Sequence, residues 1–168
     1  MRIVAIVQAR MGSTRLPNKV MKEISGIPII EILLSRLSHA SELDQIIVAT
    51  STNEINLPLV ECVERLGYSC EQGSEDDVLN RYFQSAMKHS ADVIVRITGD
   101  CPLVDHGLVD EIIYKFKSSN VDYLSNNNPP TYPDGLDIEV FSFEALKKAN
   151  NEACSLFDRE HVTPYLRN

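Results

Sequence analysis

Short, almost continuously apolar runs alternate in the first half of the chain with stretches in which apolar residues recur every three or four positions. The clearest runs are Ile3 to Val7, Gln45 to Thr50 and Asp92 to Ile97. Such runs are typical of buried strands, and the longer spacing between them is typical of amphipathic helices. The alternation predicts an α/β fold, a three-layer domain in which a mainly parallel sheet lies between helices.

Turn and capping residues mark where the predicted helices begin and where the second half changes character. Helix starts are predicted at Pro28, Asn56, Ser74 and Ser142. A further helix is predicted from about Leu108 to Phe116, followed by strands at 121–124 and 136–141. The segment from Asn126 to Gly135, NNNPPTYPDG, lies between these strands and predicts a loop long enough to have a function.

Composition narrows the possible classes of protein. The chain has 168 residues, 43% of them apolar, which predicts a single domain over residues 1–168. Its 16 basic and 24 acidic residues give a formal charge of −8, which argues against nucleic acid or a membrane as the main partner. No apolar stretch is long enough for a secretory signal or a membrane span, so we expect a cytoplasmic protein. Four cysteines without paired spacing, among them Cys101, predict reduced thiols and no zinc site.

The segment directly after the first strand, QARMGSTRLPNK, combines small residues with three cationic side chains. Triphosphate binding needs this mixture, because a glycine permits close backbone approach, hydroxyl groups donate hydrogen bonds and cations offset the phosphate charge. The residues that fit this purpose are Arg10, Gly12, Ser13, Thr14, Arg15 and Lys19. The segment is neither a Walker A motif nor a GxGxxG fingerprint, and a solvated surface turn is the alternative.

A second polar segment, RITGDCPLVD, begins in the strand that ends near Ile97. A carboxylate at the tip of a parallel strand can face bound phosphates, so Asp100 is the candidate ligand for Mg²⁺. The alternative is that Asp100 only caps a turn or a helix. We expect the nearby Asp105 to cap the helix that follows.

The strings QAR and GSTRLPNK, together with the Gly-Asp-x-Pro element, resemble the cytidylyltransferases that activate acidic sugars, the synthetases of CMP-KDO and CMP-acylneuraminate. Within them, the chain is most similar to the branch of spore coat polysaccharide biosynthesis. The resemblance implies a nucleotide-diphospho-sugar transferase-like, Rossmann-like domain that binds CTP and Mg²⁺. It implies that Arg10, Ser13, Arg15 and Lys19 hold the phosphates. Asn18 stands where the family usually has glycine, a mild departure because asparagine tolerates left-handed backbone.

The resemblance also implies where the base and the acceptor sugar bind. The stretch QGSEDDVLNR is similar to the element that contacts cytosine and ribose, which assigns Gly73 and Ser74 to the nucleotide. Within the same stretch Asp77 and Arg81 are spaced for an ion pair on one helix face, an alternative to a binding role.

The later loop is similar to the acceptor side of these enzymes. This likeness points to three acidic residues, which are suited to sugar hydroxyls: Asp134, Asp137 and Glu139. An acceptor that carries a carboxylate would need a cation as well, for which Arg96 and Arg159 are the candidates.

We therefore expect an enzyme that transfers CMP from CTP to an acidic sugar and releases pyrophosphate, in the synthesis of a surface polysaccharide. Similar proteins usually continue for several dozen residues and carry a second metal-binding Asp there, so we expect this domain to lack its carboxyl-terminal part. The missing strand would leave a sheet edge or an apolar patch exposed, so we also expect a homodimer. Two alternatives stay open. One is a glycosyltransferase, or a nucleotidyltransferase that uses another nucleotide, and the other is a non-catalytic nucleotide-binding or assembly module.

Overall fold

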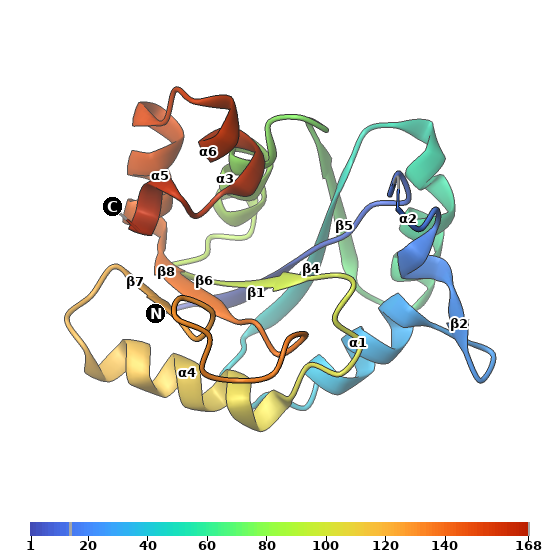
Figure 1. Cartoon of the computed structure of the whole chain (residues 1–168), viewed down its shortest axis with the longest axis horizontal. Helices are drawn as coiled ribbons and strands as arrows, with labels where there is room; N and C mark the ends of the chain where they lie inside the picture. Colours follow the sequence, from blue (N-terminus) through green and yellow to red (C-terminus); the bar gives the residue numbers. More distant parts are fainter. Residues whose placement is uncertain (14, 168) are drawn as a thin grey trace.

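A six-stranded sheet forms the centre of the computed structural model, which describes residues 1–13 and 15–167 (Figure 1). The strands follow the order β5-β4-β1-β6-β8-β7. Their bounds are β1 Ile3–Gln8, β4 Gln45–Ser51, β5 Ser69–Gly73, β6 Val93–Thr98, β7 Tyr123–Ser125 and β8 Glu139–Ser142. β5, β4, β1 and β6 run parallel, whereas β8 is antiparallel to both β6 and β7. The prediction of a mainly parallel sheet is therefore confirmed.

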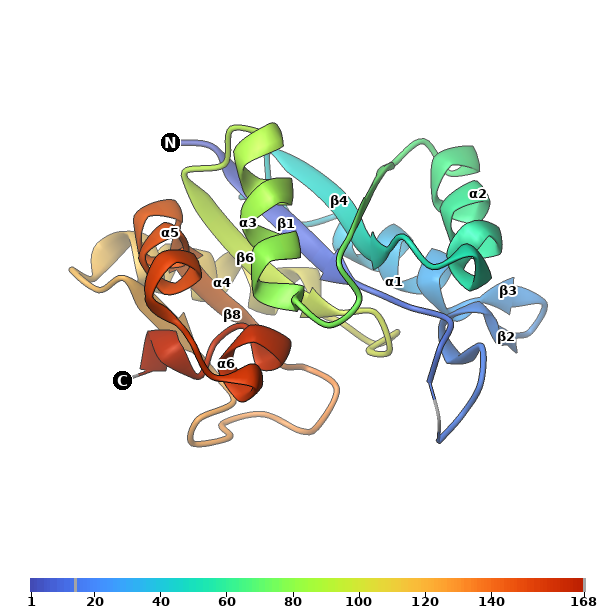
Figure 2. The ribbon, with the colours of Figure 1, turned by 90° about the horizontal axis from the view of Figure 1, so that it is seen from above.

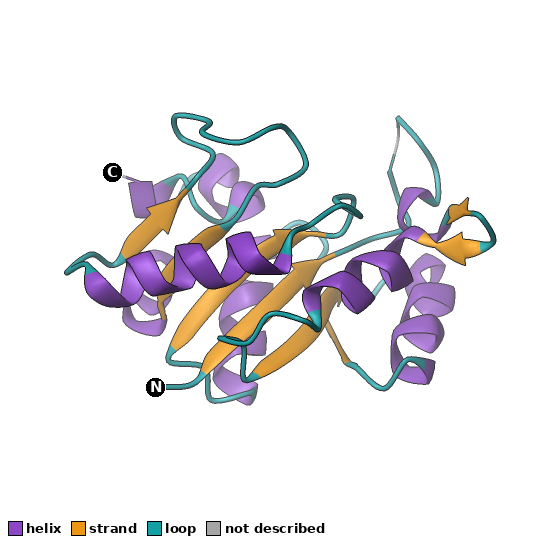
Figure 3. Cartoon of the chain, turned by 90° about the horizontal axis from the view of Figure 1, so that it is seen from below, coloured by secondary structure: helices purple, strands orange, loops and turns teal. Residues whose placement is uncertain are grey.

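Helices cover both faces of this sheet. They are α1 Ile29–Leu37, α2 Leu57–Arg65, α3 Val78–Lys88, α4 His106–Ser118, α5 Phe143–Glu152 and α6 Leu156–His161. Figure 2 shows α3, α5 and α6 on one face, and Figure 3 shows α1 and α4 on the other. The predicted three-layer α/β domain is thus confirmed. Within the described residues, no helix combines the length and apolar character needed to cross a membrane.

The central strand β1 explains why the first apolar run is continuous. Ala5 and Val7 pack into the cluster formed with α1, α2 and α4. Val4 and Ile6 point the other way and pack with α3 and α5. A parallel strand that is covered on both faces has no polar side, so its sequence does not alternate.

Side-chain caps define where several helices begin. Asp105 accepts a hydrogen bond from the backbone N–H of Leu108, as predicted, and Ser142 caps α5 in the same way. The predicted start of α3 at Ser74 is wrong, because Asp77 is the cap and accepts from the N–H of Asn80. The hydroxyl oxygen of Ser74 instead accepts from the N–H of Asp77 and shapes the turn before the helix.

The remaining short elements connect the layers. A small antiparallel hairpin, β2 Glu23–Ile24 and β3 Ile27–Pro28, precedes α1 and was not predicted. The described part of the chain also contains three 3₁₀ turns: η1 Lys19–Met21, η2 Glu54–Asn56 and η3 Tyr165–Arg167. The strands predicted at 121–124 and 136–141 are both shifted towards later residues. β8 begins late because Ile138, just before it, pairs with Asn126 of the loop.

Candidate active site

The two predicted ligand-binding segments meet where β1 and β6 end. These strands are parallel neighbours, and Gln8 at the end of β1 is in register with Thr98 at the end of β6. Lys19 lies in η1, just after the first loop, and its Nζ is 2.5 Å from Oδ2 of Asp100. The candidate phosphate lysine and the candidate metal carboxylate therefore touch, although 81 positions separate them.

Gly99 makes the close approach of these two segments possible. Its N–H donates to the carbonyl oxygen of Gln8 at 2.7 Å. A Cβ at position 99 would lie 2.7 Å from Cβ of Ala9 and 2.9 Å from the oxygen of Gln8. Only glycine fits this contact without displacing backbone. From the sequence, Gly99 was noted as part of the Gly-Asp-x-Pro element but received no role of its own, although a glycine directly after a strand is a sign of close packing.

Replacing Gly99 by alanine is expected to lower the free energy of unfolding by about 1–3 kcal/mol, the usual effect of overpacking. The added methyl group would push the loop that carries Asp100 away from β1. Urea unfolding measures the effect. Gly12→Ala is the matched control, since a Cβ there would meet only Glu75 at 3.8 Å. An equal loss of stability in the two variants would contradict this explanation.

A cavity of about 260 Å³ opens between the two segments. Of the residues predicted to hold phosphates or metal, it is lined by Arg10, Ser13, Arg15, Lys19 and Asp100. Thr14, also predicted, lies outside the described residues. Three cations around one small cavity make it suitable for phosphate groups.

The backbone of the first loop is held in a fixed form around this cavity. Asn18 has left-handed backbone with φ 57°, as expected for a position where the family usually has glycine. Its N–H donates to the carbonyl oxygen of Met11, and the N–H of Met11 donates to Asn56. Gly12 lies in the same loop with free space around its Cα, although it does not line the cavity.

The Lys19–Asp100 pair sets the charge state of the site. Burial alone would raise the pKa of Asp100, but the hydrogen bond and the positive charge of Lys19 outweigh it and hold the pKa below its usual value. Asp100 is therefore ionised near neutral pH. Within the described part of the chain, no group of three His, Cys, Asp or Glu side chains could hold a metal ion by itself. Any metal here depends on further oxygen atoms from a ligand or from water.

A larger cavity of about 960 Å³ adjoins Asp100 on the side of α4 and the 132–137 loop. Asp134 and Asp137, predicted to contact the acceptor, both line it. Burial and then the charge of Asp134 raise the pKa of Asp137. Cys101 also lines this cavity, and burial raises the pKa of its thiol, so it is neutral and a poor nucleophile. The four cysteines are free thiols, as predicted.

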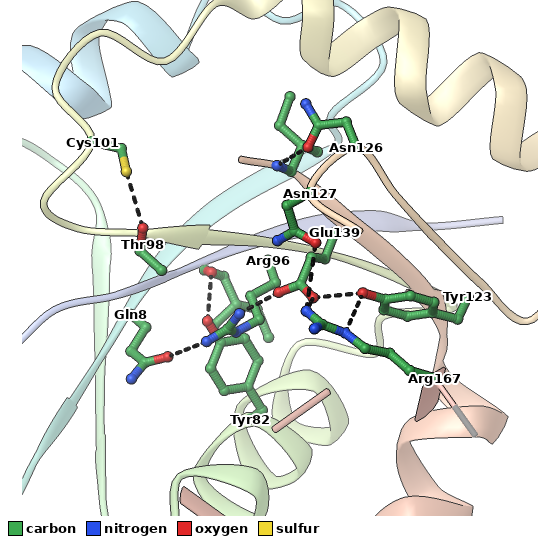
Figure 4. A network of polar contacts seen from close by, with 12 residues as sticks. Gln8, Tyr82, Arg96, Thr98, Cys101, Tyr123, Asn126, Asn127, Glu139 and Arg167 are labelled. Atoms are coloured by element: carbon green, nitrogen blue, oxygen red, sulfur yellow. Dashed lines mark hydrogen bonds and ion pairs between the residues drawn. The ribbon is translucent and has the colours of Figure 1, made fainter. Parts of the chain in front are cut away.

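Glu139 is not part of that cavity. It lies in β8, is 2% exposed, and its carboxylate pairs with Arg96 and with Arg167 (Figure 4). Tyr123 also donates to it at 2.6 Å. The predicted contact between Glu139 and a sugar remains untested, but its oxygen atoms already have three partners inside the chain.

A third cavity, of about 500 Å³, lies on the other side of the phosphate cavity, against α3 and α6. The predicted nucleotide residues Gly73 and Ser74 do not line this cavity. Both contact Arg81, which does line it and donates to the carbonyl oxygen of Ser74 at 2.7 Å. The alternative ion pair between Asp77 and Arg81 does not form. Asp77 instead accepts two hydrogen bonds from Arg159, at 2.9 and 2.5 Å.

This bidentate pair also decides the role of Arg159. Two of its three remaining N–H groups donate to Asn150. Arg159 therefore ties α6 to the start of α3 and has little capacity left for a substrate carboxylate. Arg96 is similarly held by Glu139 and by the side chain of Gln8.

Comparison with known proteins identifies the protein family to which this chain belongs. The model of the cytidylyltransferase family matches residues 4–168, and the chain belongs to this family. It is 34% identical over 172 residues to the spore coat polysaccharide biosynthesis protein SpsF of Bacillus subtilis, covering 99% of this chain and 70% of that protein. It is 33% identical over 154 residues to 3-deoxy-manno-octulosonate cytidylyltransferase 2 of Hydrogenovibrio crunogenus, covering 89% of this chain and 56% of that protein.

A solved structure agrees with this assignment. A cytidylyltransferase from Leptospira borgpetersenii serovar Hardjo-bovis matches with a TM-score of 0.93 at 33% identity, covering 98% of this chain and 70% of that one. The resemblance drawn from the sequence motifs is thereby confirmed, and so is the nucleotide-diphospho-sugar transferase-like fold. The chain is a nucleotidyltransferase of the cytidylyltransferase family.

Proposed function

We propose that this chain transfers CMP from CTP to a hydroxyl group of a sugar, in the synthesis of a surface polysaccharide. The observation that carries the proposal is the contact between Lys19 and Asp100, which joins a cationic loop to a carboxylate that lines both the small phosphate cavity and the adjoining cavity of about 960 Å³. The similarity to a spore coat polysaccharide protein and to a 3-deoxy-manno-octulosonate cytidylyltransferase supports the nucleotide and the acidic sugar.

In the proposed reaction, the oxygen of an acceptor hydroxyl group attacks the α-phosphorus of CTP while its proton passes to water, and the bond from this phosphorus to the oxygen that bridges to the β-phosphorus breaks. The phosphate chain would lie in the small cavity, where Arg10, Arg15 and Lys19 neutralise its charge. Lys19 would exchange Asp100 for phosphate oxygens, and the departing pyrophosphate would leave with its negative charge stabilised. The acceptor would occupy the cavity with Asp134 and Asp137, which accept hydrogen bonds from its hydroxyl groups.

Mg²⁺ fits the donor set that this site offers. It is usually held by one or two carboxylates together with water and substrate phosphates. Asp100 supplies one ionised carboxylate, and its Oδ1 is not used by Lys19. When bound, such an ion would neutralise charge on the phosphates during transfer. Asp100 would orient it towards the phosphate cavity.

Pyrophosphate release tests this proposal. The chain is mixed with CTP, UTP, ATP or GTP, each with Mg²⁺ and a panel of sugars with and without a carboxylate. The expected result is pyrophosphate release with CTP that depends on an acidic sugar. In a parallel mixture that contains nucleotide sugars instead of triphosphates, transfer of the sugar without pyrophosphate release would favour a glycosyltransferase. Nucleotide binding without release, for every sugar tested, would favour a non-catalytic module.

A further inference from the structure

Gln8 is the last residue of β1, and its side chain lies where two cavities meet. It lines both the phosphate cavity of about 260 Å³ and the cavity of about 500 Å³ against α3 and α6. Arg10 is the other residue that lines both. The sequence motif assigns the phosphates to Arg10 and to later residues of the loop, and not to Gln8. A ligand that extends from one cavity into the other nevertheless has to pass Gln8.

Arg96 fixes which end of the Gln8 amide faces the protein. Its Nη2 donates to Oε1 of Gln8 at 3.3 Å. A guanidinium group can only donate hydrogen bonds, so the amide oxygen has to face Arg96 and the amide nitrogen has to point away from it. Figure 4 shows this arrangement, with the oxygen of Gln8 directed at Arg96 and its nitrogen on the far side.

Arg96 is itself held in place by contacts that do not involve Gln8. Its Nη1 pairs with the buried carboxylate of Glu139, and its Cζ lies 5.9 Å from the centre of the Tyr82 ring. Tyr82 is fully buried, and its hydroxyl group donates to the carbonyl oxygen of Ile6. The group that orients the amide is therefore anchored in the core, and the amide is oriented before any ligand binds. Donors fixed in advance stabilise charge without a further cost of reorganisation.

The amide nitrogen of Gln8 is available to a ligand. Among the described residues, Nε2 has no hydrogen-bond acceptor, and it is not one of the buried polar atoms that lack a partner. Its two N–H groups therefore reach the open space of the cavities. Arg10, Arg15 and Lys19 make the small cavity suitable for anions. An anionic oxygen is a favourable acceptor for these N–H groups, because hydrogen bonds with an ionised partner are roughly twice as strong as neutral ones.

We propose that Gln8 contacts the bound triphosphate, its Nε2 donating to a phosphate oxygen where the small cavity meets the cavity against α3. The inference rests on the proposed function, because it takes the ligand to be a triphosphate. It adds a neutral donor from β1 to the cations of the loop. It also gives the Arg96–Glu139 pair a part in the site, since Arg96 acts through Gln8 and not on the ligand.

Calorimetry with inorganic tripolyphosphate and Mg²⁺ tests this contact in two variants. Gln8→Met removes both N–H groups, and we expect the affinity to fall by roughly 10- to 100-fold, as for the loss of a hydrogen bond to a charged group. Gln8→Glu keeps an oxygen that accepts from Arg96 but turns a second, negatively charged oxygen towards the phosphates. Its affinity should fall further, by more than about 100-fold, because like charges then face each other.

The order of the two variants separates a ligand contact from a purely structural role. If Gln8 only supported Arg96, Gln8→Glu would strengthen that support and would bind tripolyphosphate like the unmodified chain, whereas Gln8→Met would bind it less well. That order would overturn the inference. Affinities within threefold of the unmodified chain in both variants would overturn it as well, and so would an unmodified chain that binds no tripolyphosphate.

Urea unfolding shows whether the variants are folded. If Gln8→Met does not fold, Gln8→Glu alone decides, because the two roles predict opposite results for it. Gln84→Glu changes an exposed amide of α3 that lines neither cavity, and as the matched control it should leave the affinity unchanged. The proposed function fails separately, if the unmodified chain binds tripolyphosphate with this dependence on Gln8 yet releases no pyrophosphate from CTP with any sugar.

Discussion

Lys19→Met is expected to lower kcat for pyrophosphate release by about 10²- to 10³-fold, the usual effect of removing one donor that stabilises developing charge. Lys19 is the cation that contacts Asp100, and it also lines the cavity proposed for the phosphates. Its loss would leave the departing pyrophosphate less neutralised and would remove the partner that holds Asp100 in place. Steady-state kinetics with CTP and an acidic sugar measure the change.

Lys22→Met is the matched control for this prediction. Lys22 is exposed one turn further on and does not line the phosphate cavity. The Lys19–Asp100 pair is partly exposed, so its loss should hardly affect stability, and both variants should unfold at nearly the same urea concentration. If Lys19→Met kept kcat within threefold of the unmodified chain, or if Lys22→Met lost as much, the proposed role of Lys19 would be wrong.

The sequence predicts the first half of this fold well because the signals there are local. Apolar runs such as Ile3 to Val7 are buried on both faces, and the spacing of apolar residues in α1 is visible within nine residues. The hairpin before α1 was missed because each of its strands has only two residues, Glu23–Ile24 and Ile27–Pro28. Two residues are too few to show a period.

The ion-pair partners of Asp77 and Arg81 could not be predicted from the sequence, because they depend on how elements distant in the chain are placed. Asp77 and Arg81 have the right spacing for a pair on a helix, yet Arg159, 82 positions away from Asp77, binds Asp77 instead. This leaves Arg81 directed into a cavity, which no local pattern indicates. The reverse holds for Lys19 and Asp100. Both follow strands, and the carboxyl ends of parallel strands gather at one edge, so their approach could be expected as soon as β1 and β6 are neighbours.

Glu139→Gln is expected to lower the free energy of unfolding by about 3–5 kcal/mol at neutral pH, the usual effect of breaking a buried ion pair. The substitution keeps the shape of the side chain and its hydrogen bond with Tyr123. It removes the negative charge that Arg96 and Arg167 share, so both guanidinium groups lose their counter-ion. Glu111→Gln, which breaks an exposed pair with Lys115, is the control and should leave the free energy of unfolding nearly unchanged, because solvent screens that pair.

The stability difference between the unmodified chain and Glu139→Gln should depend on pH, and this dependence tests whether the difference is electrostatic. Burial alone would raise the pKa of Glu139, but Arg96, Tyr123 and Arg167 outweigh burial and hold the pKa below its usual value. A carboxylate with a lowered pKa in the folded state contributes stability above its unfolded pKa of about 4.3, and this contribution is lost as the pH falls through the folded value. At acidic pH Glu139 becomes neutral, like glutamine. The difference between the unmodified chain and Glu139→Gln should therefore be largest at pH 7 and should shrink below about pH 4. A difference that stayed constant between pH 7 and pH 3 would show that packing, and not charge, gives this carboxylate its importance.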